Sequence, residues 1–404
     1  MKKRTNRRML AFYILMAVVL TVGTFATVIG PDSNDSDEIA NTSIPSTPQP
    51  TPFTFPTPEP DGPSLTLRPP LVNSSGLFQL SVPEGWEITS NGYDFNLSGA
   101  RSAFLSSTRL SVIDAQLLVG INYPSHQALS DDYFTTDYFF RSWGSYDGFT
   151  ETKRTVGDRV VIDFELGLGQ QTYLARQVAW MDGDWVRLIR FVVPENNPAL
   201  LDKLDELIVP TIISYNDQRD TSPTWVSYTD TERRFLIRHP NWTLISGGGA
   251  PILEAPLSPA SMILRSQEDQ LLSSLDEAEA YVQETLRPGA EILSSQVTNR
   301  EYGSGYMVSF ADRDNEGNPV SVLAVMLNDD ANNLYVAEIR LTRGEIDLLQ
   351  PSEVPEYQEL RTIADTFMIL PPEGTIAVPA ENPPVIESTE ETQPTEEATE
   401  ESTN

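Results

Sequence analysis

The sequence predicts an α+β protein with two tandem copies of an antiparallel-sheet α/β/α sandwich, preceded by one transmembrane helix. Three observations lead to this prediction. One uncharged run of 21 residues lies near the N-terminus. Five sequence features recur in the same order, at offsets of 144–157 residues. The predicted strands come in runs and do not alternate with helices, which favours an antiparallel sheet covered by helices.

Residues 1–30 predict a cytoplasmic basic segment followed by a membrane anchor. Five basic residues lie among the first eight, and residues 9–29 carry no charge. A helix of that length is about 31 Å long, which matches the hydrocarbon core of a bilayer. Because basic residues stay on the cytoplasmic side, we expect a single-pass membrane protein whose C-terminal bulk is extracytoplasmic. The alternative is a signal peptide cleaved after Ala26, which would release the protein.

Two segments have compositions that are typical of disordered chain. Residues 31–70 contain 11 prolines, which indicates an extended stalk. Residues 371–404 contain nine glutamates and no basic residue, which indicates a disordered acidic tail. We therefore expect a stalk that holds the folded part away from the membrane and a tail that solvates the other end.

Charge and cysteine content narrow the classes of function. The formal net charge of −31 predicts no binding to nucleic acid, because a surface this negative repels phosphates. It leaves open an acidic surface protein that binds cations. The chain has no cysteine, which excludes disulfides, thiol catalysis and zinc–cysteine sites.

The repeat is clearest at the start and at the end of each copy. Phe78-Gln-Leu-Ser-Val-Pro83-Glu-Gly-Trp86 corresponds to Phe235-Leu-Ile-Arg-His-Pro240-Asn-Trp242, and each reads as a strand that ends at a proline turn. Ile208-x-x-Thr211 corresponds to Ile363-x-x-Thr366, at the end of a stretch with helical spacing. These matches predict one domain at 71–216, a polar linker at 217–224 and a second domain at 225–370.

Between these landmarks, each copy reads as strands, a helix, several strands and a closing helix. Ser130 precedes one helical stretch, and Ser274-x-x-Glu277 forms a capping box before the other. The segment from Asp312 to Pro319 resembles the start of a calcium loop, but Leu323 takes the place of the required glutamate. We therefore expect a hairpin turn there.

The opening Phe-x-Leu-x-Val-Pro-x-Gly-Trp at residues 78–86, with its capping and closing helices, resembles the PsbP-like domain. The resemblance covers about 145 residues twice, and the second copy departs from the motif by lacking the glycine. It implies an α/β/α sandwich of a bacterial envelope protein. It also implies a binding or assembly module without catalysis, and it assigns no functional residue.

The predicted contact site is aromatic. Seven aromatic residues lie between positions 133 and 146, and helical spacing places most of them on one side. Phe134 and Tyr138 point away from that side and are neighbours four residues apart. They are either packed against another part of the chain or exposed as a contact for a partner protein, glycan or lipid.

No motif for catalysis stands out. The two histidines, His126 and His239, have no nucleophile motif beside them, and no phosphate-binding loop is present. The sequence thus predicts no catalytic residue, cofactor or metal ligand. The predicted function is a non-catalytic binding or scaffold protein, tethered through residues 9–29, whose partner is an envelope protein or glycan. The alternatives are an envelope enzyme with a carboxylate pair and a cation-binding surface protein. The oligomeric state stays open.

Overall fold

The computed structural model describes residues 64–94, 100–107, 111–142, 151–168, 171–246, 249–314, 316–372 and 375. The predicted anchor at 9–29, nearly all of the predicted stalk and nearly all of the predicted tail lie outside the described residues. Within the described residues, no helix combines the length and apolar character needed to cross a membrane. We call residues 64–216 the first half and residues 225–372 the second half.

The first half is built around a seven-stranded sheet with the order β3-β4-β5-β9-β8-β7-β6, in which all neighbours are antiparallel. Its strands are β3 (Glu87–Asp94), β4 (Ala100–Ser106), β5 (Val112–Val119), β6 (Thr152–Val156), β7 (Arg159–Leu168), β8 (Gln171–Asp182) and β9 (Trp185–Pro194). A three-stranded sheet accompanies it, with β1 (Leu67–Val72), β2 (Phe78–Pro83) and β10 (Ile213–Ser214).

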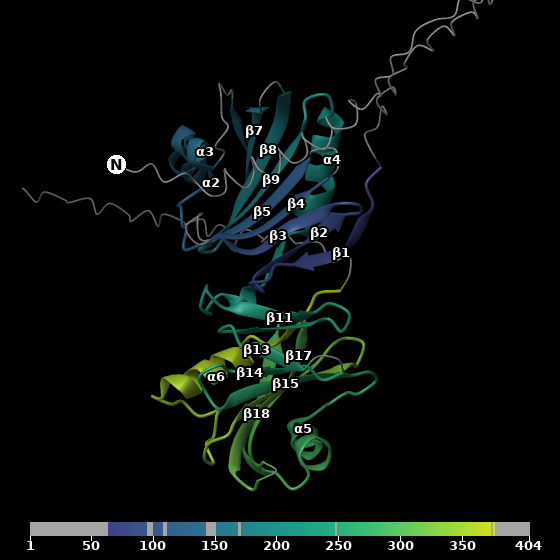
Figure 1. The fold of residues 1–404 in the computed structure, drawn as a ribbon, viewed down its shortest axis with the longest axis vertical. Coiled ribbons are helices and arrows are strands. Elements are labelled where there is room, and N and C mark those ends of the chain that lie inside the picture. Colours follow the sequence, from purple (N-terminus) through teal and green to yellow (C-terminus); the bar gives the residue numbers. More distant parts are fainter. Residues whose placement is uncertain are drawn as a thin grey trace, which may run out of the picture.

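Helices cover both faces of this large sheet (Figure 1). One face holds α4 (Pro198–Ile208), which continues as the short 3-10 helix η3 (Val209–Thr211). The other face holds α2 (His126–Ala128), the π-helical turn η2 (Leu129–Tyr133) and α3 (Thr136–Ser142). The layering is therefore helix, sheet, helix.

The second half repeats this plan. Its large sheet has the order β13-β14-β15-β19-β18-β17-β16, and its small sheet has the order β11-β12-β20. The strands are β11 (Val226–Asp230), β12 (Phe235–His239), β13 (Thr243–Ser246), β14 (Ile252–Glu254), β15 (Ala260–Gln267), β16 (Glu291–Arg300), β17 (Gly303–Arg313), β18 (Pro319–Asn328), β19 (Leu334–Leu341) and β20 (Met368–Ile369). The helices are α5 (Leu275–Tyr281), the π-helical turn η5 (Val282–Leu286) and α6 (Pro355–Asp365).

The central strands are apolar on both faces because each large sheet separates two cores. In β9, Ile189 and Phe191 face the core beneath α4, whereas Leu188 and Val192 face the core beneath η2 and α3. This pattern is typical of a strand that is buried on both sides. The prediction of mostly antiparallel sheets in two sandwich-like units is confirmed.

One threonine explains why the closing motif recurs. The Thr211 hydroxyl donates to the Ile208 carbonyl at 2.7 Å and accepts from the Ser81 amide at 2.9 Å. In the second half, the Thr366 hydroxyl donates to the Ile363 carbonyl at 2.7 Å and accepts from the Arg238 amide at 2.9 Å. Each threonine thus ties the end of the closing helix to the central strand of the small sheet, β2 in the first half and β12 in the second.

The expected hairpin at 312–319 is present. β17 and β18 pair from Arg313↔Pro319 onward, and Gly317 takes the left-handed conformation with φ +85°. One carboxylate oxygen of Asp314 accepts from the Glu316 amide at 2.9 Å and from the Asn318 amide at 2.8 Å. The carboxylate is therefore used to close the turn.

The helical stretches differ between the halves. Ser274 caps α5 as predicted, with its hydroxyl accepting from the Glu277 amide at 3.2 Å. In the first half the cap is Ser125 and not Ser130, which lies inside η2 and is buried. The predicted single aromatic helix is also broken there, because Phe134 leaves the helical conformation between η2 and α3.

Candidate functional site at the junction of the two halves

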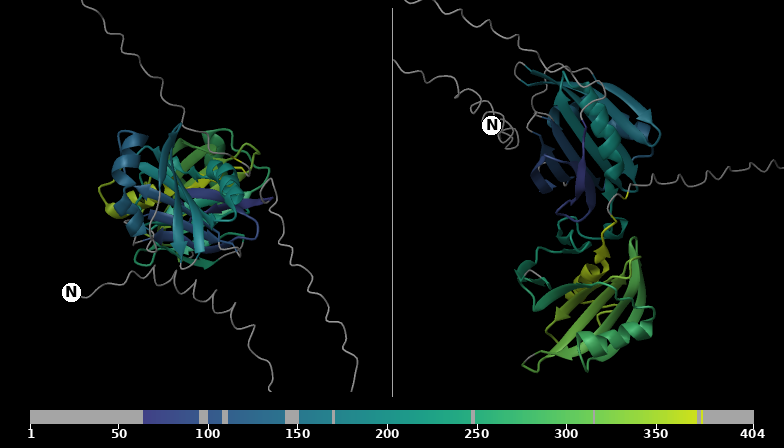
Figure 2. Two further views of the ribbon diagram at one scale, coloured as in Figure 1. Left: turned by 90° about the horizontal axis from the view of Figure 1, so that it is seen from above. Right: turned by 90° about the vertical axis from the view of Figure 1, so that its right-hand side faces the viewer.

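The two halves meet through their small sheets (Figures 1 and 2). One buried apolar cluster at this junction contains Val72, Ile213 and Tyr215 from the first half and Leu236, Met368 and Leu370 from the second. The backbone of β11 also reaches across, since the Ser227 amide donates to the Ser74 carbonyl at 2.9 Å. A continuous core of this kind stabilises one relative orientation of the halves.

Arg238 is the most buried charged residue of the junction. It lies on β12 with an exposed fraction of 0%, and its guanidinium crosses to the first half, where Nε donates to the Ser75 carbonyl at 2.6 Å. Nη2 donates to the Ser222 carbonyl at 2.9 Å. Gly76 leaves the space for this approach, because a Cβ there would lie 3.1 Å from Cγ of Arg238 and 2.7 Å from the Cβ of Ser227.

The polar segment predicted as a linker, 217–224, is packed into the junction. Its first residues complete the short 3-10 helix η4 (Asn216–Gln218), and Gln218 is fully buried. The side-chain nitrogen Nε2 of Gln218 donates to the Thr366 carbonyl at 2.9 Å. The Asp217 carboxylate accepts from the Glu301 amide at 2.9 Å. The segment therefore holds the second half as well as connecting to it.

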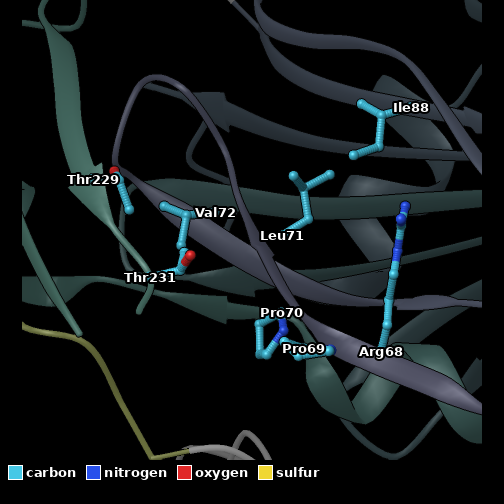
Figure 3. Close-up of a pocket in the computed structure, with 8 residues that line it drawn as sticks. All are labelled: Arg68, Pro69, Pro70, Leu71, Val72, Ile88, Thr229 and Thr231. Atoms are coloured by element: carbon cyan, nitrogen blue, oxygen red, sulfur yellow. The ribbon is translucent and has the colours of Figure 1, made fainter. Parts of the chain in front are cut away.

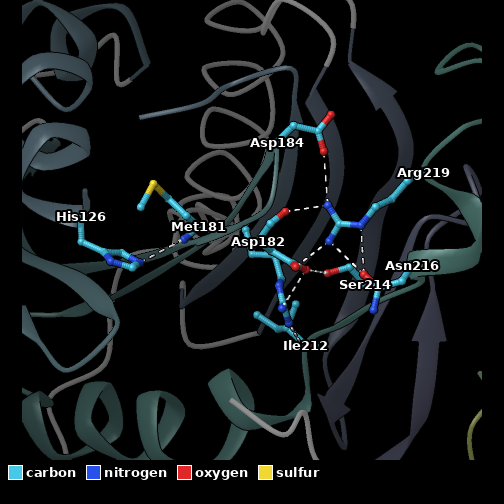
Figure 4. Close-up of polar contacts among 9 residues, drawn as sticks. His126, Met181, Asp182, Asp184, Ile212, Ser214, Asn216 and Arg219 are labelled. Carbon is cyan, nitrogen blue, oxygen red and sulfur yellow. Dashed lines mark hydrogen bonds and ion pairs between the residues drawn. The ribbon is translucent and has the colours of Figure 1, made fainter. Parts of the chain in front are cut away.

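Arg219 fixes the same segment to the β8–β9 turn of the first half (Figure 4). Its Nη2 lies 2.5 Å from Oδ1 of Asp182, and its guanidinium lies 4.5 Å above the ring of Trp185. Arg187 pairs with the other carboxylate oxygen of Asp182 at 2.8 Å, and the Ser214 hydroxyl donates to that oxygen at 2.8 Å. Asp182 is thus a hub that joins β9, β10 and the connecting segment.

A groove opens beside this junction, with a volume of about 360 Å³ (Figure 3). It is lined by Arg68, Pro69, Pro70, Leu71, Val72, Ile88, Thr229 and Thr231. The lining is mostly apolar, and Ile88 is 43% exposed. Both halves contribute, because β1 and β3 belong to the first half whereas Thr229 and Thr231 belong to the second.

Two features of β1 shape this groove. Pro69 and Pro70 lie where the β1–β2 register shifts between Arg68 and Leu71, and prolines provide no amide hydrogen for pairing with a further strand. Arg68 donates from Nη2 to the Trp86 carbonyl at 3.1 Å, which holds its side chain against the start of β3. The groove can therefore bind through side chains and not by extension of the sheet.

No protein-family model matches the chain, and no curated protein matches it. Solved structures do. A point mutant of the protein Mog1 matches with a TM-score of 0.28 and 10% identity, over 37% of this chain and 96% of that one. The cyanobacterial PsbP (CyanoP) of Synechocystis sp. PCC 6803 matches with a TM-score of 0.25 and 12% identity, over 37% and 92%. The type VI secretion immunity protein TplEi of Pseudomonas aeruginosa, complexed with an "L" peptide, matches with a TM-score of 0.21 and 15% identity, over 72% and 99%.

The predicted aromatic contact residues are placed differently from the expectation. Phe134 has an exposed fraction of 0% and belongs to the core beneath η2 and α3, so its predicted outward orientation is wrong. The reason is the break between η2 and α3, which removes the helical relation between Phe134 and Tyr138. Instead their rings meet edge to face, with centroids 5.1 Å apart.

Tyr138 lies partly buried against the same core, and its hydroxyl accepts a hydrogen bond from Arg190 of β9. The Arg190 guanidinium also lies 5.5 Å above the Tyr138 ring. Burial raises the pKa of the Tyr138 phenol, so the residue stays neutral and serves as an acceptor. The structure thus brings the two predicted residues together inside the first half, where they pack against its sheet.

Both histidines accept hydrogen bonds from the backbone. Nε2 of His126 accepts from the Met181 amide at 3.3 Å, and Nδ1 of His239 accepts from the Trp242 amide at 2.8 Å. Burial, together with Arg238 next to it, lowers the pKa of His239 to about 4. Within the described ranges, no group of three or more His, Asp or Glu side chains is arranged to hold a metal ion.

The low pKa of His239 predicts a pH-dependent stability. The folded state holds the neutral ring, so its stabilisation is present above pH 6.5 and is lost as the pH falls from 6.5 towards 4. His239→Asn keeps an acceptor for Trp242 and removes the titration. We expect the difference in unfolding free energy between the wild type and this variant to change by about 2–3 kcal/mol across that window. Urea unfolding at several pH values measures it, and a constant difference would contradict the assignment.

That Arg238 and Gln218 lie at a junction was not predicted from the sequence, although the sequence contains one signal for Arg238. The alignment of the motifs Phe78–Pro83 and Phe235–Pro240 matches Arg238 with Ser81, directly after the three apolar residues Phe235, Leu236 and Ile237. A charged residue at such a position needs buried partners. That signal predicts a polar contact but does not say that the contact crosses between the halves. Gln218 offers no such signal, because it lies in a polar segment.

Proposed function

We propose that the chain is a non-catalytic binding protein of the cell envelope, in which two PsbP-like halves form one rigid head on a membrane-tethered stalk. The junction groove takes an extended apolar segment of a partner protein. The single observation that carries this proposal is the composite apolar groove, in which both halves supply lining residues.

An exposed apolar side chain at the groove favours a binding role. Ile88 is left 43% exposed at the groove, within a run of exposed residues at the start of β3. Removing apolar surface of this kind from water contributes about 25 cal/mol per Å², from which the cost of association is subtracted. Because five consecutive residues of β1, from Arg68 to Val72, line the groove, it suits an extended chain better than a compact small molecule (Figure 3).

The rigid junction adds to this argument. Arg238 and Gln218 hold the two sides of the groove through buried hydrogen bonds, so Thr229 and Thr231 keep their positions relative to β1. A preorganised site binds more tightly because less freedom is lost on association. The net charge of −31 disfavours nucleic acid as the partner.

Site-specific crosslinking tests the proposal. A photoreactive phenylalanine analogue at position 88, in the full chain in its native membrane, should give one discrete crosslinked protein. The matched control is position 156, where Val156 of the edge strand β6 is 54% exposed but lies outside the groove. Thr231→Arg, made in the other half, should abolish the product from position 88 without changing the melting temperature.

Two results would overturn the proposal. One is the same set of products from positions 88 and 156, which would indicate general surface contact. The other is a product from position 88 that Thr231→Arg leaves unchanged, because the second half would then play no part in binding.

A further inference from the structure

A second site lies in the second half, on the face of the large sheet opposite α6. The first half carries 27 residues from the helix cap Ser125 to the next strand at Thr152, whereas the second half carries only 17 from Ser274 to Glu291. The extra residues of the first half include α3. Among the described elements of the second half, none corresponds to α3.

In the first half, α3 helps to enclose an arginine. Arg190 has an exposed fraction of 2%, and Tyr138 of α3 accepts a hydrogen bond from its Nη2. Nε of Arg190 donates to Gln177 at 2.9 Å, and Nη1 lies 3.8 Å from the carboxylate of Asp114. A phenol, an amide and a carboxylate thus surround this guanidinium.

The register identifies the equivalent residue of the second half. Arg190 on β9 is paired with Asp114 on β5 and with Gln177 on β8. Arg340 on β19 is paired with Ser261 on β15 and with Val322 on β18. The arginine is kept, but a serine replaces the carboxylate, a valine replaces the amide, and no residue from an α3 equivalent is present among the described residues.

Arg340 is consequently poorly partnered. Its Nε is buried without a hydrogen bond, and its Nη2 lies 3.9 Å from Asp312. Burial, followed by the neighbouring Arg287, lowers the pKa of Arg340. The side chain is nevertheless 22% exposed, so an acceptor can reach it from solvent.

The surroundings carry a local excess of positive charge. Glu338, which is fully buried, lies 2.7 Å from Arg265 and 3.0 Å from Arg287. Arg287 also lies 3.2 Å from Asp312. The cluster therefore contains three guanidiniums and two carboxylates, in a chain whose overall charge is strongly negative. Glu254 on β14, which pairs with Ser261, is a further acid on this face and is exposed.

We propose that Arg340, with Arg265 and Arg287, forms a binding site for a carboxylate side chain on an acidic segment of a partner protein, which docks where α3 lies in the first half. The carboxylate supplies the charge that Asp114 provides to Arg190, and the segment supplies the cover that α3 provides. Hydrogen bonds between guanidinium and carboxylate are charge-assisted and therefore strong. This site is separate from the junction groove.

The test uses the full chain and a fluorescein-labelled hexaglutamate peptide, with hexaglutamine as the neutral control peptide. Fluorescence anisotropy at low salt measures the dissociation constant. Arg340→Leu should weaken hexaglutamate binding at least tenfold. Arg343→Leu is the matched control, because Arg343 is only three residues away but is 61% exposed and contacts Glu356. It should change binding by less than twofold, and both variants should keep the wild-type melting temperature.

Each other outcome overturns the proposal. Equal loss in the two variants would show a general charge effect, and equal binding of hexaglutamine would show that no carboxylate is recognised. Inorganic phosphate competing as well as the peptide at the same concentration would show a small-anion site with no segment. If changing the nine tail glutamates to glutamine tightens peptide binding tenfold, the occupant is the tail of this chain and not a partner.

Discussion

Arg238→Met should lower the free energy of unfolding by about 3–5 kcal/mol, because it removes a fully buried guanidinium that donates to carbonyls of the first half and of the connecting segment. Methionine fills a similar volume but cannot donate, so the carbonyls of Ser75 and Ser222 lose their partner. Each buried acceptor left without a hydrogen bond costs about 1–3 kcal/mol. Urea denaturation of the wild type and the variant measures the change.

The effect should also appear locally at the junction. Hydrogen exchange of the Ser227 amide, which donates to the Ser74 carbonyl, should become faster in Arg238→Met. Arg361→Met is the control, since Arg361 pairs with Asp365 on the surface of α6 at 3.2 Å and such pairs contribute about 0.5 kcal/mol or less. Equal destabilisation by the two substitutions would show that the buried hydrogen bonds of Arg238 stabilise the fold no more than a surface ion pair does.

Gly305→Ala should destabilise the second half by about 3 kcal/mol or more. Gly305 lies in β17 and pairs with Leu327 of β18, and a Cβ there would lie 1.9 Å from the carbonyl oxygen of Met326. That oxygen belongs to the backbone of the neighbouring strand, so the methyl group fits only if the two strands separate. Thermal unfolding should show a lower transition temperature for the part of the chain that contains β17 and β18.

Gly167→Ala provides a matched comparison for this effect. Gly167 is a strand glycine of β7, at which an added Cβ meets nothing within 4 Å. It should change the unfolding free energy by less than about 0.5 kcal/mol. A similar loss from both glycine substitutions would mean that chain flexibility, and not the close approach of β17 and β18, requires Gly305.

The repeat was predictable because its landmarks are local. Phe78 and Phe235 begin strands that end at prolines, and Thr211 and Thr366 close helices by the same hydrogen bonds. Alternating apolar residues report such elements directly. The resulting plan of two antiparallel sandwich-like units is confirmed, whereas the membrane anchor and the extracytoplasmic location stay predictions.

The aromatic segment shows where such reasoning stops. Helical spacing assigns Phe134 to an outer face only if the helix is continuous. The helical conformation is interrupted at Phe134 itself. The junction lies further beyond reach, because the contact of Gln218 with Thr366 joins residues 148 positions apart. Neither a break in a helix nor a contact between two halves has a periodic signature in the sequence. The partial exposure of Arg340 has no such signature either, because it depends on the lack, among the described elements of the second half, of a helix equivalent to α3.

The junction also limits how the architecture can grow. Ile213 and Met368 occupy corresponding positions on β10 and β20, and both lie in the one shared apolar cluster. Tyr215 and Leu370, two residues later in each half, do the same. The halves therefore meet through corresponding surfaces, as the subunits of a two-fold symmetric dimer do. Such an interface is closed, because each surface is covered by the other, so a third copy of this unit would find no surface of this kind left to bind.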